Sequence, residues 1–182
     1  AGCIVIGKTN TPELGLGSNT FNRLFGRTAN AWDPAVTAGG SSGGAAVALS
    51  RRMLAVADGS DFMGSLRNPA GWNHIFGLRP SPGRVPSWPK PEVWVSQLGT
   101  EGPMGRTVRD LARLLDIQSG CDPRAPLSLD DARNSFVPDP DVSLSSRRVA
   151  WLGDLEGYLP VEPGILDVCE SALRRMADGG AQ

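Results

Sequence analysis

The chain has 182 residues, enough for one domain with a hydrophobic core, and its apolar and charged fractions of 40% and 20% are ordinary. Its net charge of −1 argues against nucleic acid or an anionic membrane as a partner, and no apolar run approaches transmembrane length. The three cysteines, Cys3, Cys121 and Cys169, are too widely spaced to indicate a metal site or a disulfide framework, so we expect a reducing, cytoplasmic setting.

The first part of the chain predicts a strand, a short helix and a long loop. The apolar run at residues 3–6 is typical of a short buried strand. Pro12 and Glu13 suit the first turn of a short helix. Residues 21–36 are rich in Asn, Asp, Gly and Pro, which favours a loop.

The middle of the chain predicts a helix followed by the central strand. An alanine-rich run indicates a helix that begins at Ser42 or Gly43 and ends near Arg52. Residues 53–57 are apolar and are interpreted as the central buried strand. Pro69 is expected to begin another helical turn.

Irregular segments surround the next predicted helix. Residues 80–95 contain five prolines and predict an irregular surface excursion. Thr107 and Asp110 have the spacing of a capping box, so a helix should begin there, and Gly120 should stop it. Residues 122–141 are polar and proline-rich, which predicts a loop or linker.

The last part of the chain predicts a strand and an amphipathic helix. Residues 148–152 form the expected strand. Apolar residues recur three and four apart over residues 162–177, which indicates an amphipathic helix that Gly179 caps. Strands alternating with helices predict an α/β fold with layers around a largely parallel or mixed sheet.

Two serine–glycine segments carry the chemistry. Residues 39–44 read GGSSGG, and residues 58–67 read DGSDFMGSLR. Glycines let another group approach the backbone N–H closely. A serine hydroxyl beside free N–H groups supplies a nucleophile and an oxyanion hole, the two parts that acyl transfer needs. Taken separately, the first segment also fits a linker or helix start, and the second a capped turn with a surface ion pair.

Two other motif matches are rejected on structural context. Residues 2–9 match the phosphate-loop pattern, but their middle residues predict a strand and Pro12 interrupts the helix that should follow. Residues 40–44 match the nucleophile elbow of α/β-hydrolases, but residues 33–38 before them are poor strand material. The triad of that fold also needs a histidine, and His74 is the only one.

The chain resembles the amidase signature family over nearly its whole length. The two hallmark serines of that family correspond to Ser41 and Ser65, which lie 24 residues apart as in the family. The flanking segments match as well, in the right order: GKTNTPE at residues 7–13, GLRP at 77–80, and GPM at 102–104, expected to open the next helix. The resemblance implies an α/β/α sandwich on one large mixed sheet.

The resemblance also implies roles for particular residues. Ser65 would be the nucleophile, and Ser41, after a cis peptide bond at Gly40–Ser41, would relay its proton to a lysine base. The oxyanion hole would be the row of backbone N–H groups leading into the nucleophile: Phe62, Met63, Gly64 and Ser65. Three residues would brace the loops: Ser42, Asp61 and Arg67. Phe62 and Met63 depart from the usual family residues and should alter the shape of the accepted substrate.

The family's catalytic lysine has no counterpart among these residues. It lies farther upstream of the GGSSGG loop than this chain extends, and Lys8 and Lys90 occupy other positions. We therefore expect residues 1–182 to be one incomplete amidase domain, an interior piece of a longer enzyme. Alone, it should be inactive and should associate with other chains, copies of itself included, through incomplete sheet edges.

These observations predict an amidohydrolase that cleaves a small-molecule carboxamide through a serine acyl-enzyme. The resemblance implies no metal and no organic cofactor. Two alternatives stay open: a catalytically inactive amidase-like scaffold protein, and the ammonia-releasing component of an amidotransferase. An assay of ammonia release with and without candidate partners would separate them.

Overall fold

Two compact units make up the computed structural model, Ala1–Pro138 and Asp139–Gln182. The structure describes residues 2–90, 92, 94, 98–130, 136–138 and 143–182. That residues 1–182 belong to one larger domain stays a prediction.

A three-stranded antiparallel sheet forms the centre of the first unit. Its order is β3 (Val56–Asp61), β5 (Thr100–Gly105) and β4 (Phe76–Gly77), so β5 is the middle strand. The sequence prediction was wrong on two points. The strand expected at residues 53–57 begins only at Val56 and lies at an edge of the sheet. Residues 102–104, expected to open a helix, lie inside β5.

Proline explains the second error. Pro103 has no N–H to give to a sheet, which usually argues against a central strand and favours a helix start. In the structure its carbonyl still accepts a hydrogen bond from the Leu78 N–H at 3.1 Å, and it pairs with Asp58 of β3. The surrounding strands therefore decide the conformation of this segment.

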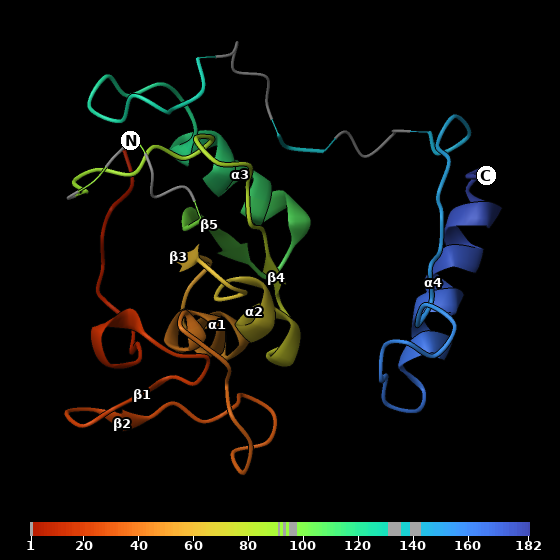
Figure 1. Ribbon diagram of the computed structural model, residues 1–182, viewed down its shortest axis with the longest axis horizontal. Coiled ribbons are helices and arrows are strands. Elements are labelled where there is room, and N and C mark those ends of the chain that lie inside the picture. The colour runs from red at the N-terminus through yellow and green to blue at the C-terminus, as the bar shows by residue number, and fades with distance from the viewer. Residues whose placement is uncertain (1, 91, 93, 95–97, 131–135, 139–142) are drawn as a thin grey trace. The chain divides into compact units, whose positions relative to one another are not determined.

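Helices lie on both sides of this sheet (Figure 1). The helices α1 (Gly43–Ser50) and α2 (Arg67–Trp72) lie on one side, and α3 (Val108–Gln118) lies on the other. Residues of α1, α2, the intervening turn and β5 form one apolar cluster: Ala45, Ala46, Leu49, Leu66, Ala70 and Met104. The helix at α1 and the amphipathic α3 were predicted correctly, whereas α2 begins two residues before Pro69.

The N-terminal part contains little regular structure. The predicted short helix is present as the 3₁₀ turn η1 (Glu13–Gly15), and the predicted loop at residues 21–36 contains a small hairpin of β1 (Phe21–Asn22) and β2 (Gly26–Arg27). The strand expected at residues 3–6 was wrong. A strand needs a neighbour for its backbone hydrogen bonds, and no described strand pairs with these residues.

The segments predicted to be irregular contain no helix or strand among their described residues, 80–90, 92, 94, 122–130 and 136–138. The rest of the predicted excursion and linker, residues 91, 93, 95, 131–135 and 139–141, lies outside the described residues.

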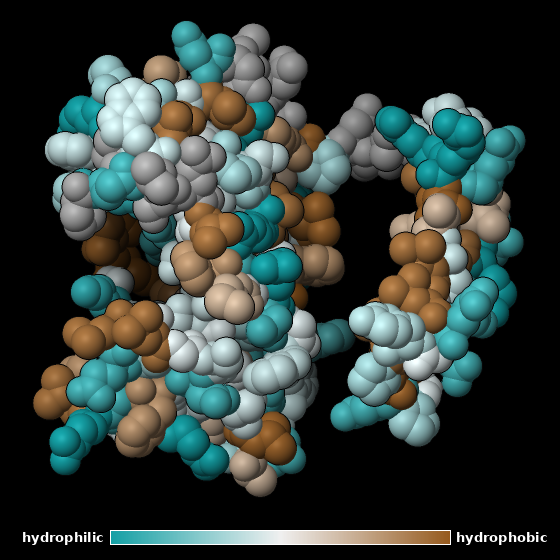
Figure 2. All heavy atoms as spheres, viewed as in Figure 1, coloured by the Kyte–Doolittle hydropathy of each residue, from teal (hydrophilic) through white to brown (hydrophobic). Residues whose placement is uncertain are grey.

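The second unit contains the helix α4 (Ile165–Asp178), which Gly179 caps as predicted. The strand expected at residues 148–152 was wrong. The Val149 N–H instead donates to the Gln182 carbonyl at 2.7 Å, and no described strand lies beside it. Apolar residues form a visible band along this unit (Figure 2). The helix α4 has no fully buried residue. No helix among the described residues is both long and apolar enough to cross a membrane.

Candidate active site

The GGSSGG loop is held in place by Thr20. The Thr20 hydroxyl donates to the Gly39 carbonyl at 2.8 Å and accepts from the Gly43 N–H at 3.1 Å, so it ties together both sides of the loop. The loop contains a cis peptide at Gly40–Ser41, as the resemblance implied. Thr20 was missed in the sequence, where no motif singles it out from the surrounding loop.

Ser42 connects this loop to strand β3. Its hydroxyl donates to the Ser60 carbonyl at 3.4 Å and accepts from the Ser60 N–H at 3.3 Å. A Cβ on Gly59 would lie 2.6 Å from the Ser42 Oγ, so only glycine leaves room for this contact. The bracing role that the resemblance implied for Ser42 agrees with this geometry.

The two serine loops lie against each other. The Ser42 N–H donates to the Ser65 carbonyl at 3.3 Å. Ser41 and Ser42 are buried, at 8% and 7% exposure, whereas Ser65 is half-buried. The fold therefore brings together two segments that are 24 residues apart in the sequence. That the Ser41 hydroxyl faces the Ser65 hydroxyl stays a prediction.

Asp61, the last residue of β3, organises the turn that carries Ser65. Its side chain is fully buried. The carboxylate accepts from the backbone N–H groups of Gly64 at 2.7 Å, Leu66 at 3.2 Å and Arg67 at 3.4 Å. Two guanidinium groups complete the shell, with Arg67 Nε at 2.9 Å and Arg79 Nη1 at 3.0 Å. The sequence singled out Asp61 and Arg67, but Arg79 only as part of a matching segment.

These contacts keep Asp61 ionised. Burial by itself would raise the pKa of the Asp61 carboxyl. The hydrogen bonds from Arg67, the Gly64 N–H, Arg79 and the Leu66 N–H outweigh it and hold this pKa well below its ordinary value. The hydrogen bond to Asp61 in turn raises the pKa of Arg67. A fixed negative charge therefore lies under the turn and holds its backbone.

One of the four N–H groups that the resemblance assigns to an oxyanion hole is already engaged within the protein. The Gly64 N–H is engaged by Asp61, so it is not free for a substrate oxygen. The remaining N–H groups, on Phe62, Met63 and Ser65, have no acceptor among the described residues. Gly64 has a φ of +114°, which suits glycine, whereas Met63 needs no left-handed backbone. The side chains of Phe62 and Met63 are exposed, at 55% and 82%.

No general base is visible beside the two serines in the described part of the chain. Lys8 is exposed, and Lys90 lines a separate cavity. The ring of His74 packs edge-on against Trp32, with centroids 6.1 Å apart. No hydrogen bond joins these residues to Ser41 or Ser65 among the residues that the structure describes.

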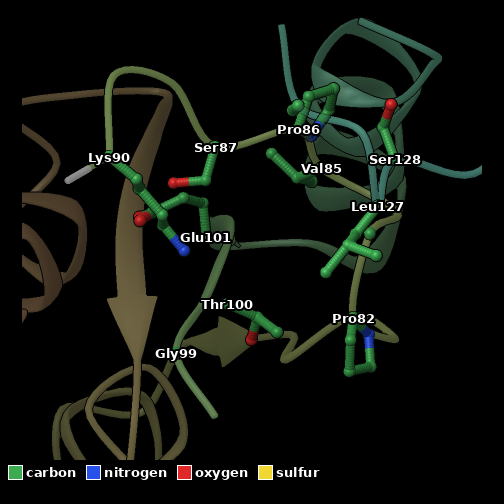
Figure 3. A pocket seen from close by; sticks show the side chains of 12 residues that line it. Pro82, Val85, Pro86, Ser87, Lys90, Gly99, Thr100, Glu101, Leu127 and Ser128 are labelled. Atoms are coloured by element: carbon green, nitrogen blue, oxygen red, sulfur yellow. The ribbon is translucent and has the colours of Figure 1, made fainter. Parts of the chain in front are cut away.

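A cavity of about 170 Å³ lies between the proline-rich loop, the start of β5 and residues 125–128 (Figure 3). The side chains of Lys90 and Glu101 lie close together in it. Burial raises the pKa of the Glu101 carboxyl, and the nearby Lys90 charge partly opposes this effect. Neither Ser41 nor Ser65 lines the cavity, so it is distinct from the serine site.

The α/β layers and the two joined serine loops define an α/β scaffold with a paired-serine site. The family model described as Amidase matches residues 1–182. The chain belongs to the amidase signature family.

Relatives of this chain include amidases and amidotransferase components. An acylamidase of Rhodococcus erythropolis is 40% identical over 182 residues, which cover 100% of this chain and 38% of the relative. A glutamyl-tRNA(Gln) amidotransferase component of Synechococcus sp. (strain RCC307) is 43% identical over 148 residues, 81% of this chain and 29% of the relative. The crystal structure of a bacterial aryl acylamidase of the amidase signature family is similar with a TM-score of 0.84 and 34% identity, over 97% of this chain and 36% of that one. The chain thus spans less than two fifths of these relatives.

Proposed function

We propose that the complete protein hydrolyses a small-molecule carboxamide through an acyl-enzyme on Ser65. The observation that carries this proposal is the hydrogen bond from the Ser42 N–H to the Ser65 carbonyl, which holds the two serine loops together. The likeness to an acylamidase supports amide hydrolysis as the reaction.

In this proposal the Ser65 hydroxyl attacks the amide carbonyl, while its proton passes through Ser41 to the base. The negative oxygen of the tetrahedral intermediate accepts hydrogen bonds from the N–H groups of Phe62, Met63 and Ser65. The C–N bond then breaks, and the leaving amine takes the proton. Water hydrolyses the ester to release the acid and regenerate Ser65. The base is proposed to be a lysine outside these 182 residues, since neither Lys8 nor Lys90 matches the family position.

The test is to treat the complete protein with a fluorophosphonate probe and to map the adduct. We expect labelling at Ser65, and a loss of amide hydrolysis of at least about 10³-fold in Ser65→Ala and Ser41→Ala. Ser60→Ala is the matched control, since the Ser42 hydroxyl forms its hydrogen bonds to the backbone of Ser60, so activity should persist. Labelling at Ser42 or at no serine would overturn the proposal, and the absence of any reactive serine would favour an inactive scaffold protein.

A second candidate function is release of ammonia for a partner enzyme. The 43% identity with a glutamyl-tRNA(Gln) amidotransferase component favours it. It uses the same serine chemistry, but hydrolysis would depend on the partner. Ammonia release that rises severalfold when a candidate partner is added would support this function, whereas full activity alone supports the simple amidase.

A further inference from the structure

Arg79 holds the backbone that leads from β3 to the nucleophile. Its Nη1 donates to the Asp61 carbonyl at 2.5 Å and to the Phe62 carbonyl at 3.1 Å, in addition to the Asp61 carboxylate. Its Nη2 donates to the Leu98 carbonyl at 2.6 Å, just before β5. One guanidinium therefore joins the end of β3, the turn and the start of the middle strand.

The two carbonyls matter because of the peptide groups to which they belong. A trans peptide is planar, and its C=O and N–H point in opposite directions. The Asp61 carbonyl shares its peptide with the Phe62 N–H, and the Phe62 carbonyl shares its peptide with the Met63 N–H. Neither peptide is cis. When both carbonyls turn toward Arg79, both N–H groups must turn away from it.

These two N–H groups, together with the Ser65 N–H, are the donors that the rest of the turn leaves available among the described residues. The Gly64 N–H is engaged by Asp61, whereas the N–H groups of Phe62 and Met63 have no acceptor in the described chain. We propose that Arg79 is a positioning residue that aims the Phe62 and Met63 N–H groups at the oxygen of the tetrahedral intermediate. This inference rests on the proposed amidase function.

Arg67 provides a built-in comparison. Both arginines form an ion pair with the Asp61 carboxylate, at 2.9 Å for Arg67 and 3.0 Å for Arg79. Only Arg79 also reaches the backbone carbonyls. A lysine in place of Arg79 would keep the positive charge but not the planar fork, so it could not hold these acceptors together.

The experiment compares Arg79→Lys and Arg67→Lys in the complete protein. Since loss of one oxyanion donor lowers kcat by about 10²–10³-fold, we expect Arg79→Lys to lower kcat by about 10²-fold and to change KM less than about threefold. Affinity for a boronic acid that forms a charged tetrahedral adduct should fall by a similar factor. Arg67→Lys should lower kcat and the affinity for the boronic acid by less than about tenfold.

Equal losses in the two variants would overturn the inference, as would a loss expressed in KM alone. If Arg79→Lys does not fold, Arg79→Gln and Arg67→Gln are compared in the same way, with the same criteria. Ser65→Ala distinguishes a failure of the proposed amidase function from a failure of the role of Arg79. If it leaves hydrolysis intact, the proposed function fails. If it abolishes hydrolysis but the two arginine variants behave alike, only the role of Arg79 fails.

Discussion

Asp61 organises the turn that carries Ser65 in the candidate site. Its fully buried carboxylate accepts hydrogen bonds from three backbone N–H groups and two arginines. A buried charge is tolerated only when it is paired and hydrogen-bonded. The N–H groups and arginines that bind the Asp61 carboxylate are therefore held in position by it. The carboxylate thereby determines the shape of the turn that carries Ser65.

We predict that Asp61→Asn destabilises the folded protein by about 3 kcal/mol at pH 7, because it leaves buried donors without a charged partner. The folded-state pKa of Asp61 is lowered from an ordinary 3.8, so the stabilisation is complete above pH 3.8 and is lost as pH falls below it. Urea unfolding of both proteins between about pH 3 and pH 7 measures this, and the difference should shrink at the acid end.

Asp122→Asn is the matched control for this prediction. Asp122 also pairs with an arginine, Arg124 at 2.7 Å, but this pair lies at the surface and should contribute little. If Asp61→Asn changes the urea midpoint at pH 7 no more than Asp122→Asn does, the organising role of Asp61 is wrong.

Among the elements, α3 shows most clearly how a local signal defines a helix. The Thr107 Oγ1 accepts from the Asp110 N–H at 3.1 Å and donates to the Asp110 carboxylate at 2.8 Å. The apolar face of α3 is buried, and its buried residues are Leu111, Ala112, Leu114 and Leu115. The cap and the apolar stripe agree, so the helix begins where the sequence predicts.

Thr107→Ala should lower the free energy of unfolding by about 1 kcal/mol, because the first turn of α3 loses its side-chain acceptor. Thr107→Ser retains the hydroxyl and should stay within a few tenths of a kcal/mol of the original protein. Thermal unfolding of the three proteins distinguishes these values. An alanine variant as stable as the serine variant would show that the cap contributes nothing.

At the scale of the whole chain, many large apolar side chains are exposed. Ile4, Val5 and Ile6 are 88%, 86% and 76% exposed, and α4 has no buried side chain. Large apolar patches of this kind mark contact surfaces or cause association.

Residues 1–182, expressed alone, should therefore associate in a concentration-dependent manner. Light scattering coupled to size-exclusion chromatography measures the mass, which we expect to exceed that of one chain at micromolar concentration. A variant with Ile4→Thr and Ile6→Thr should associate less. A monodisperse monomer over the whole concentration range would contradict the prediction.

The sequence by itself determined the features that depend on neighbouring residues. The helices α1, α3 and α4 and the cap at Thr107 follow from patterns within a few residues, because helical hydrogen bonds are local. The spacing of Ser41 and Ser65, with their flanking segments, also sufficed to indicate the family.

Only the tertiary structure decided the features that depend on distant partners. Strands pair with residues far along the chain, so the position of β5 in the middle of the sheet and the lack of a strand at residues 3–6 could not be read locally. In the same way, Thr20 reaches Gly39 and Arg79 reaches Asp61 across 19 and 18 residues. The sequence contained these side chains, but only folding brought them to the backbone groups that they hold.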